Sequence, residues 1–244
     1  MLSEAIRLTR EALAKEIYDP LVEINARNNL AYFYCALADK SKAKQTERAG
    51  YISRALEYSE GLPSYSRLFR RMHGYWLDTR AYALYLRAED IVEGTAEDDA
   101  EILIDSIRDS VRLFRQALEL GRSESDIEER AQKARQLKKK SAEWLRRKAE
   151  EEFDKAQNTL TPDSVCAIRE LLSAADEFDP LLNSGREENN FQRVKALSLL
   201  IELGRLLDST PAGNARDELT RRIAEVTKGH EECNEGTVDK AGGP

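Results

Sequence analysis

Residues 76–85 read WLDTRAYALY and residues 110–121 read SVRLFRQALELG, and these two stretches decide the fold. Both place apolar side chains at intervals of three and four residues, which is the period of an amphipathic α-helix. The first stretch is rich in aromatic and small residues. The second ends on Gly121, a residue that can take the left-handed conformation that closes a helix. We therefore predict two antiparallel helices joined as a hairpin.

The small residues of this hairpin have the spacing of a known repeat. Ala81 in the first helix, followed by Ser110, Phe114 and Ala117 in the second, resembles the signature of the tetratricopeptide repeat. The acidic segment 89–101 replaces the short turn of that family, and we expect it to form a surface turn because it is polar and contains a glycine.

A second unit of the same kind is predicted upstream, over residues 20–59. Asp19-Pro20 supplies its start, since proline pre-sets the first helical turn. The positions that resemble the markers of the family in this unit are Leu30, Ala31, Tyr34, Ile52 and Ala55.

The first helix, expected over residues 3–17 with Ser3 as its N-cap, resembles the second half of a repeat. Ala5, Thr9 and Ala12 stand at its marker positions, and Ala5, Leu8, Ala12 and Leu13 form its apolar stripe. The chain thus begins in mid-repeat. Two explanations stay open: a capping helix, or a fragment of a longer protein whose preceding helix is missing.

Downstream of the repeats at 1–121, residues 122–160 lack a strong breaker and predict one long charged connecting helix. Residues 161–228 are similar to degenerate C-terminal helical repeats, the first of which carries Ala167, Leu171 and Ala174. The remaining residues, 229–244, are polar and rich in glycine, so we expect a disordered tail.

Composition agrees with an all-α fold that has a sizeable core. Of the 244 residues, 41% are hydrophobic and 34% are charged, and the signals for β-hairpins are missing. The resemblance implies antiparallel hairpins stacked as a right-handed solenoid with a concave face, and with the long charged helix in the middle.

Cysteine usage and hydropathy indicate a soluble, cytoplasmic protein. Cys35, Cys166 and Cys233 are odd in number and far apart, so we expect reduced thiols without a disulfide or a structural zinc. No stretch approaches the roughly twenty apolar residues that span a bilayer, so no membrane partner is expected.

Catalytic chemistry is not predicted. Only two histidines are present, of which His230 lies in the tail, and no phosphate-binding, nucleophile or zinc motif occurs. Acidic runs such as residues 150–152 are adjacent rather than spaced toward an interior, so they predict solvated faces rather than a metal site. We expect no cofactor.

A partner-binding site is predicted instead from two groups of residues. The densest basic and aromatic segment could hold an acidic peptide or a nucleic acid through Arg67, Arg70, Arg71, His73 and Arg80. The resemblance adds Asn25, Asn28 and Asn29, because peptide-binding members of the family use asparagine in this helix to hold the ligand backbone.

The leading interpretation is a non-enzymatic protein–protein interaction module, a scaffold or sensor region of a larger bacterial-type signalling or defence protein. Its ligand would be a peptide or protein in the concave groove. A nucleic-acid binder that uses the Arg67–Arg80 face is one alternative, which the net charge of −7 disfavours. A structural oligomerisation module is the other, and the sequence leaves the oligomeric state open.

Overall fold

The computed structural model describes residues 1–15, 19–41, 44–60, 70–96, 99–120, 125–156 and 162–180. These residues form seven helices and no strand, so the all-α prediction is confirmed for this part of the chain. The helices are α1 (Leu2–Leu13), α2 (Pro20–Lys40), α3 (Gln45–Ser59), α4 (Arg70–Val92), α5 (Ala100–Glu119), α6 (Ser125–Ala156) and α7 (Pro162–Phe178). The part of the expected C-terminal repeats that follows residue 180 and the expected tail lie outside the described residues.

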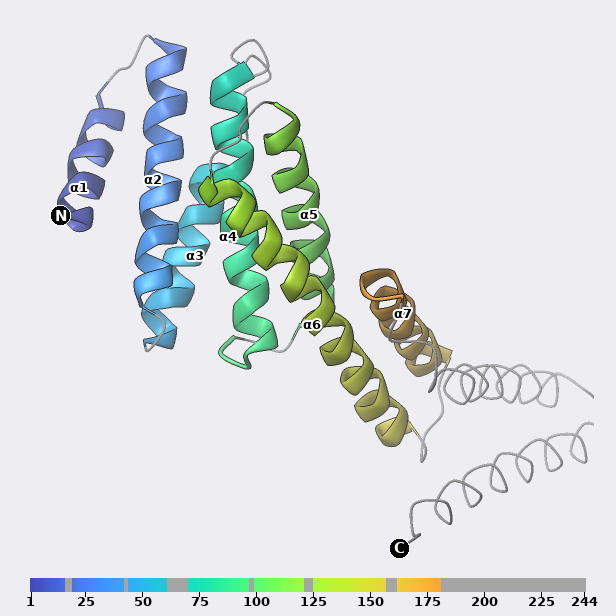
Figure 1. Cartoon of the computed structure of the whole chain (residues 1–244). Helices are drawn as coiled ribbons and strands as arrows, with labels where there is room; N and C mark the ends of the chain where they lie inside the picture. The colour runs from blue at the N-terminus through green and yellow to red at the C-terminus, as the bar shows by residue number, and fades with distance from the viewer. Residues whose placement is uncertain are drawn as a thin grey trace, which may run out of the picture. The chain divides into compact units, whose positions relative to one another are not determined.

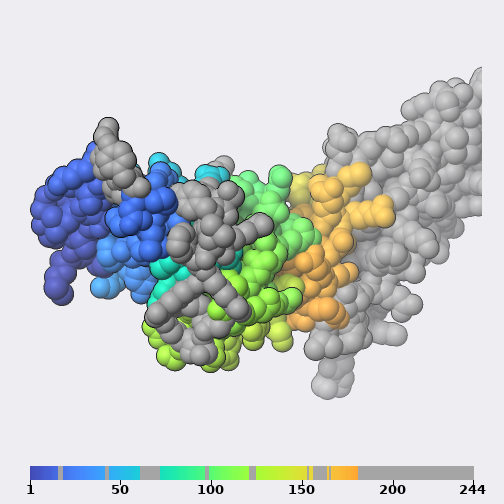
Figure 2. Space-filling view, turned by 90° about the horizontal axis from the view of Figure 1, so that it is seen from above, coloured from blue at the N-terminus to red at the C-terminus, as the bar shows by residue number. Residues whose placement is uncertain are grey.

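The chain divides into two compact units, residues Met1–Ser141 and Ala142–Pro244, and the boundary falls inside α6. The first unit contains α1 to α5 and the first half of α6. In it, α2 and α4 lie side by side and run in the same direction, while α3 returns beside α2 and α5 returns beside α4 (Figure 1). In the space-filling view the blue atoms of α1 and α2 adjoin the cyan to green atoms of α3 to α5 (Figure 2).

Two aspartates begin helices in this unit. Asp19 precedes Pro20, and its carboxylate accepts a hydrogen bond from the Leu21 amide at 2.8 Å. Asp99 does the same for the Ile102 amide at 3.0 Å at the start of α5. Each carboxylate satisfies an amide that has no partner inside its own helix, and its negative charge suits the positive end of the helix dipole.

The start of the chain differs from the expectation. Helix α1 begins at Leu2, with Met1 rather than Ser3 as its N-cap. Ile6 is the buried residue of this helix, whereas Leu8 is 52% exposed and Ala12 is exposed. The predicted apolar stripe of α1 therefore lies on a different side of the helix from the buried face. The prediction was based on the small marker residues, whereas burial of the larger Ile6 removes more apolar surface from water.

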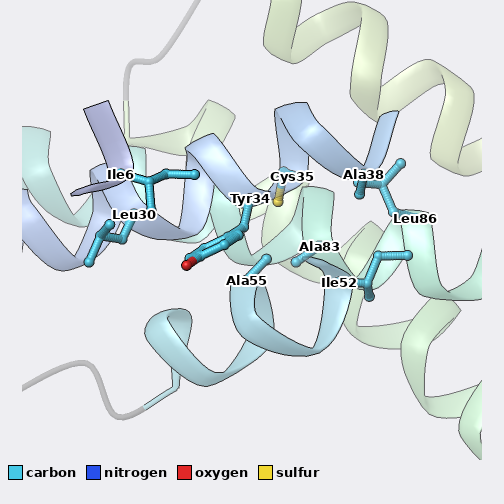
Figure 3. Close-up of a cluster of buried hydrophobic side chains, with 9 residues drawn as sticks. All are labelled: Ile6, Leu30, Tyr34, Cys35, Ala38, Ile52, Ala55, Ala83 and Leu86. Carbon is cyan, nitrogen blue, oxygen red and sulfur yellow. The ribbon is translucent and has the colours of Figure 1, made fainter. Parts of the chain in front are cut away.

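The first hydrophobic core joins four helices. Its buried members are Ile6 of α1, Leu30, Tyr34, Cys35 and Ala38 of α2, Ile52 and Ala55 of α3, and Ala83 and Leu86 of α4 (Figure 3). Ala38, Ala55 and Ala83 are fully buried. Such small side chains let helix backbones approach closely, while Tyr34 fills space by stacking on Tyr58 at 5.9 Å between ring centroids.

The second core joins α4, α5 and the first half of α6. Leu77, Ala81 and Leu84 pack with Leu113, Phe114 and Ala117, and α6 closes the cluster with Ile127, Ala131 and Ala134. Ser110 is fully buried, and its hydroxyl donates to the Ala81 carbonyl at 2.9 Å. The hairpin expected for α4 and α5 is therefore present, with its small residues at the contact.

The first residues of the acidic segment 89–101 are helical instead of forming the expected turn. Helix α4 continues to Val92, and Glu89 and Asp90 are only 8% and 4% exposed. Arg48 of α3 explains their burial: it donates to Asp90 Oδ1 at 2.5 Å, to Glu89 Oε2 at 2.7 Å and to the Ala38 carbonyl at 3.2 Å. The expected surface turn is reduced to the residues that follow Val92, where Gly94 takes a φ of 72°.

The second unit is described over the end of α6 and over α7. Ala142, Leu145 and Ala149 of α6 are buried. Helix α7 buries Ile168, Leu171, Ala174, Ala175 and Phe178. Ala167, which was predicted to share the buried face of α7 with Leu171 and Ala174, is exposed, because the neighbouring Ile168 occupies the buried position.

The Arg48 contacts generate the first prediction. Replacing Arg48 by methionine leaves two buried carboxylates without their cation, so the free energy of unfolding should fall by about 3–5 kcal/mol in urea titrations. The same change at Arg54, which is exposed on α3, should alter it by less than about 0.5 kcal/mol. Adding Glu89→Gln and Asp90→Asn to Arg48→Met should recover part of the loss. An Arg48→Met variant as stable as the parent would contradict this account.

Candidate functional site

Helix α2 carries an uncharged, open stripe along one face. The stripe, here called the α2 stripe, consists of Val22, Asn25, Ala26, Asn29, Tyr32, Phe33 and Ala36. Their spacing of three and four residues places them on one side of the helix. Val22 is 49% exposed, Tyr32 is 41% exposed and Asn29 is also exposed, while the other members are half-buried. In a chain with 34% charged residues, a charge-free face of this length is a distinct feature.

An arginine from α6 borders this stripe. Arg130 donates to Asp78 Oδ2 of α4 at 3.0 Å, and its guanidinium carbon lies 5.1 Å from the ring centroid of Tyr82 and 6.0 Å from that of Tyr32. Tyr32, Asp78, Tyr82 and Arg130 are called the Arg130 cluster below. The cation lies against two aromatic rings and one buried carboxylate, all of which favour its charge. The cluster connects α2, α4 and α6.

Further contacts extend from the Arg130 cluster along α4. The Tyr82 and Tyr85 rings stack at 6.3 Å, and the Tyr85 hydroxyl donates to Glu89 Oε1 at 2.7 Å. Burial raises the pKa of both phenols, and the negative charge of Asp39 adds to the effect at Tyr82. Burial likewise raises the pKa of the Cys35 thiol, whose Sγ lies 4.0 Å from the Thr79 carbonyl. The two phenols and the thiol therefore stay protonated at neutral pH, and none of the three is activated as a nucleophile.

Two buried polar atoms of this region have unused hydrogen-bonding capacity. Asn28 is 7% exposed, and its Oδ1 has no hydrogen-bond partner among the residues that the structure describes. The same holds for the Nε of Arg130. An acceptor and a donor of this kind are costly to bury unless another group satisfies them.

The residues predicted for partner binding are distributed over three environments. Asn25 and Asn29 lie on the α2 stripe, and Asn28 of the same helix is buried. His73 is half-buried in α4 and has contacts of its own. Arg80 is also half-buried and donates to the Ser59 carbonyl at 2.8 Å, beside the Trp76 indole at 3.1 Å, so it caps the end of α3. Arg67 and the side chains of Arg70 and Arg71 lie outside the described part of the chain.

Sequence reasoning missed Val22, Tyr32, Asp78 and Arg130, among other residues of this region. Tyr32 could have been found, because residues 28–38 contain no charge and their polar or aromatic members cannot all face the core. Val22 precedes that run and gave no such signal. Asp78 and Arg130 gave no signal, because each is one of many charges on a helix and its partner is remote in the sequence.

Within the described ranges, no group of three or more His, Cys, Asp or Glu side chains is placed to hold a metal ion. Cys35 and Cys166 are free thiols, the first buried and the second exposed, and Cys233 lies outside these ranges. None of the helices in the part of the chain that the structure describes is both long and apolar enough to cross a bilayer.

Comparison with protein-family models, with curated proteins and with solved structures finds no match to this chain.

Tyr82 generates a prediction about pH. Above about pH 10 the unfolded chain releases the Tyr82 proton while the folded chain keeps it, so the free energy of unfolding falls as pH rises, by at most about 1.4 kcal/mol per pH unit. Tyr82→Phe removes this contribution. Urea titrations from pH 8 to pH 11 should therefore show a shallower alkaline loss of stability in the variant. At pH 8 Tyr82 is protonated in both the folded and the unfolded chain, so the difference in free energy of unfolding between parent and variant at that pH measures the effect of the substitution on packing. If the free energies of parent and variant fell in parallel from pH 8 to pH 11, the result would contradict a buried, protonated Tyr82.

Proposed function

We propose that this chain is a non-enzymatic protein-binding module, built as a right-handed solenoid of tetratricopeptide-like hairpins, that holds an uncharged peptide segment of a partner against the α2 stripe. The single observation that carries the proposal is the exposed, charge-free stripe itself. The centres of protein interfaces are depleted of charged residues and enriched in tyrosine, and Tyr32 lies on the stripe.

The arrangement of the first unit supports a repeat architecture. The α2/α3 pair and the α4/α5 pair are both packed hairpins, and α2 lies beside α4 in the same direction. Ala31 and Ala81, which stand at corresponding marker positions of the two first helices, are both fully buried. In such a stack the first helices of successive hairpins line one common face.

Tyr32 is suited to be the anchor of the interface. Its ring is held in place by Arg130, at 6.0 Å from the guanidinium carbon, and by Phe33, at 6.5 Å in an edge-to-face contact. A side chain that is already ordered loses little conformational entropy when a partner covers it. The exposed 41% of Tyr32 then contributes hydrophobic surface to binding.

The asparagines supply the polar contacts. Asn25 and Asn29 each carry an amide that can both donate and accept, so they can pair with the N–H and C=O groups of a peptide backbone. Peptide-binding members of the family that the sequence resembles often use asparagine in this helix for that purpose. A charged peptide segment would lose hydration against the stripe without finding an opposite charge, so the preferred segment is uncharged.

Peptide selection tests this proposal. A random peptide library is selected on the immobilised full chain, and the enriched peptides are titrated against variants by calorimetry. Tyr32→Ala and Asn29→Lys should each weaken binding at least about tenfold, which corresponds to about 1.4 kcal/mol. The enriched sequences should be poor in charged residues.

Two variants serve as matched controls. Leu8→Ala removes an exposed apolar side chain from α1, and Gln136→Lys adds a charge to an exposed position of α6, both outside the stripe. Neither should change peptide affinity. Failure to enrich any binder, or equal losses in the stripe and control variants, would refute the assigned face.

A further inference from the structure

The first unit contains a cavity on a different surface from the α2 stripe. It has a volume of about 450 Å³, and it lies between the end of α1, the first turns of α2 and the end of α3. This volume falls within the range of small-molecule sites in proteins. The cavity residues of α2, Glu23 and Arg27, are not members of the stripe.

Positive charge dominates this cavity. Arg10, Lys15 and Arg27 line it, against Glu23 as the one acidic lining residue described, in a chain whose net charge is −7. Arg27 donates its Nε to Glu23 at 2.9 Å, so this pair is internally compensated. Arg10 and Lys15 form no ion pair with any residue that the structure describes. Two cations that have no acidic partner among the described residues therefore line one concavity.

The remaining walls are apolar and aromatic. Leu13 and Ala14 of α1 form one side, and Tyr58 of α3 forms another. The Tyr58 ring is fixed, because it stacks on Tyr34 with an interplanar angle of 7°. A rigid aromatic wall next to two available cations suits a ligand that has a flat organic body and an anionic group.

We propose that this cavity binds a small organic phosphate, in which Arg10 and Lys15 hold the phosphate dianion and the organic part packs against Tyr58 and Leu13. An arginine offers paired N–H donors that match two phosphate oxygens, and a lysine adds a compact charge. The proposal is independent of protein binding by the α2 stripe, because no residue is shared between the two sites.

Calorimetric titration of the full chain with phenyl phosphate tests the site. Binding should be measurable, and Arg10→Gln/Lys15→Gln should weaken it at least about tenfold. Glu23→Gln should strengthen binding, because it removes the one opposing charge among the described lining residues. Methyl phosphate carries the same charge without the ring, and it should bind more weakly than phenyl phosphate.

Charge-matched variants separate a site from diffuse attraction. Arg54→Gln/Lys139→Gln removes the same total charge at exposed positions outside the cavity, and Glu128→Gln is the corresponding control for Glu23→Gln. All controls should bind phenyl phosphate like the parent. Absence of binding, or equal losses in the cavity and control variants, would overturn the site, and equal affinities for the two phosphates would overturn the role of Tyr58 and Leu13.

Discussion

The first unit depends on one buried cation. Arg48 of α3 is 2% exposed and reaches Glu89 and Asp90 of α4 together with the last turns of α2. A buried guanidinium is tolerated only when its charge is opposed and its donors are used, and here both conditions require three helices to be in register at once. A shift of α4 along α2 would separate the Arg48 guanidinium from both carboxylates. The contact therefore specifies how the two hairpins align, beyond any stability that it adds.

The alignment of the two hairpins determines which side chains α6 contacts. With α2 and α4 in fixed register, Tyr32 and Tyr82 lie close enough for one guanidinium to contact both rings, and Asp78 is available to it. Arg130 is brought to this place because Ile127, Ala131 and Ala134, in the same turns of α6, pack into the second core. The apolar contacts supply the driving force for docking, and the arginine selects the orientation. The border of the α2 stripe is thus a consequence of the Arg48 contacts one layer away.

Local features of this fold follow from the sequence, and the remote contacts do not. Periodicity predicts the helices and Asp19-Pro20 predicts the start of α2, because each signal lies within a few residues of the structure that it specifies. Ala81, Ser110, Phe114 and Ala117 predict the α4/α5 contact through the spacing that resembles a known repeat. The pairs Arg48–Glu89 and Arg130–Asp78 join residues 41 and 52 positions apart. With 38 basic and 45 acidic residues, charge alone cannot select them. Glu89 and Asp90 were placed in a surface turn for this reason.

The same distinction applies to the proposed interface. Part of the stripe on α2 can be read from the sequence, because residues 28–38 carry no charge and helix geometry dictates that some of them face outward. The sequence does not show which outward residue is held in place before a partner binds. Tyr32 is held by Arg130, which lies 98 residues later in the chain. Binding at such a face combines two requirements: an uncharged surface, encoded locally, and a fixed anchor, supplied by tertiary contacts. In this chain the fixed anchor is supplied by the Arg130 cluster, which also attaches α6 to α2 and α4. Arg130 therefore contributes both to the α6 contact and to the ordering of Tyr32 on the stripe.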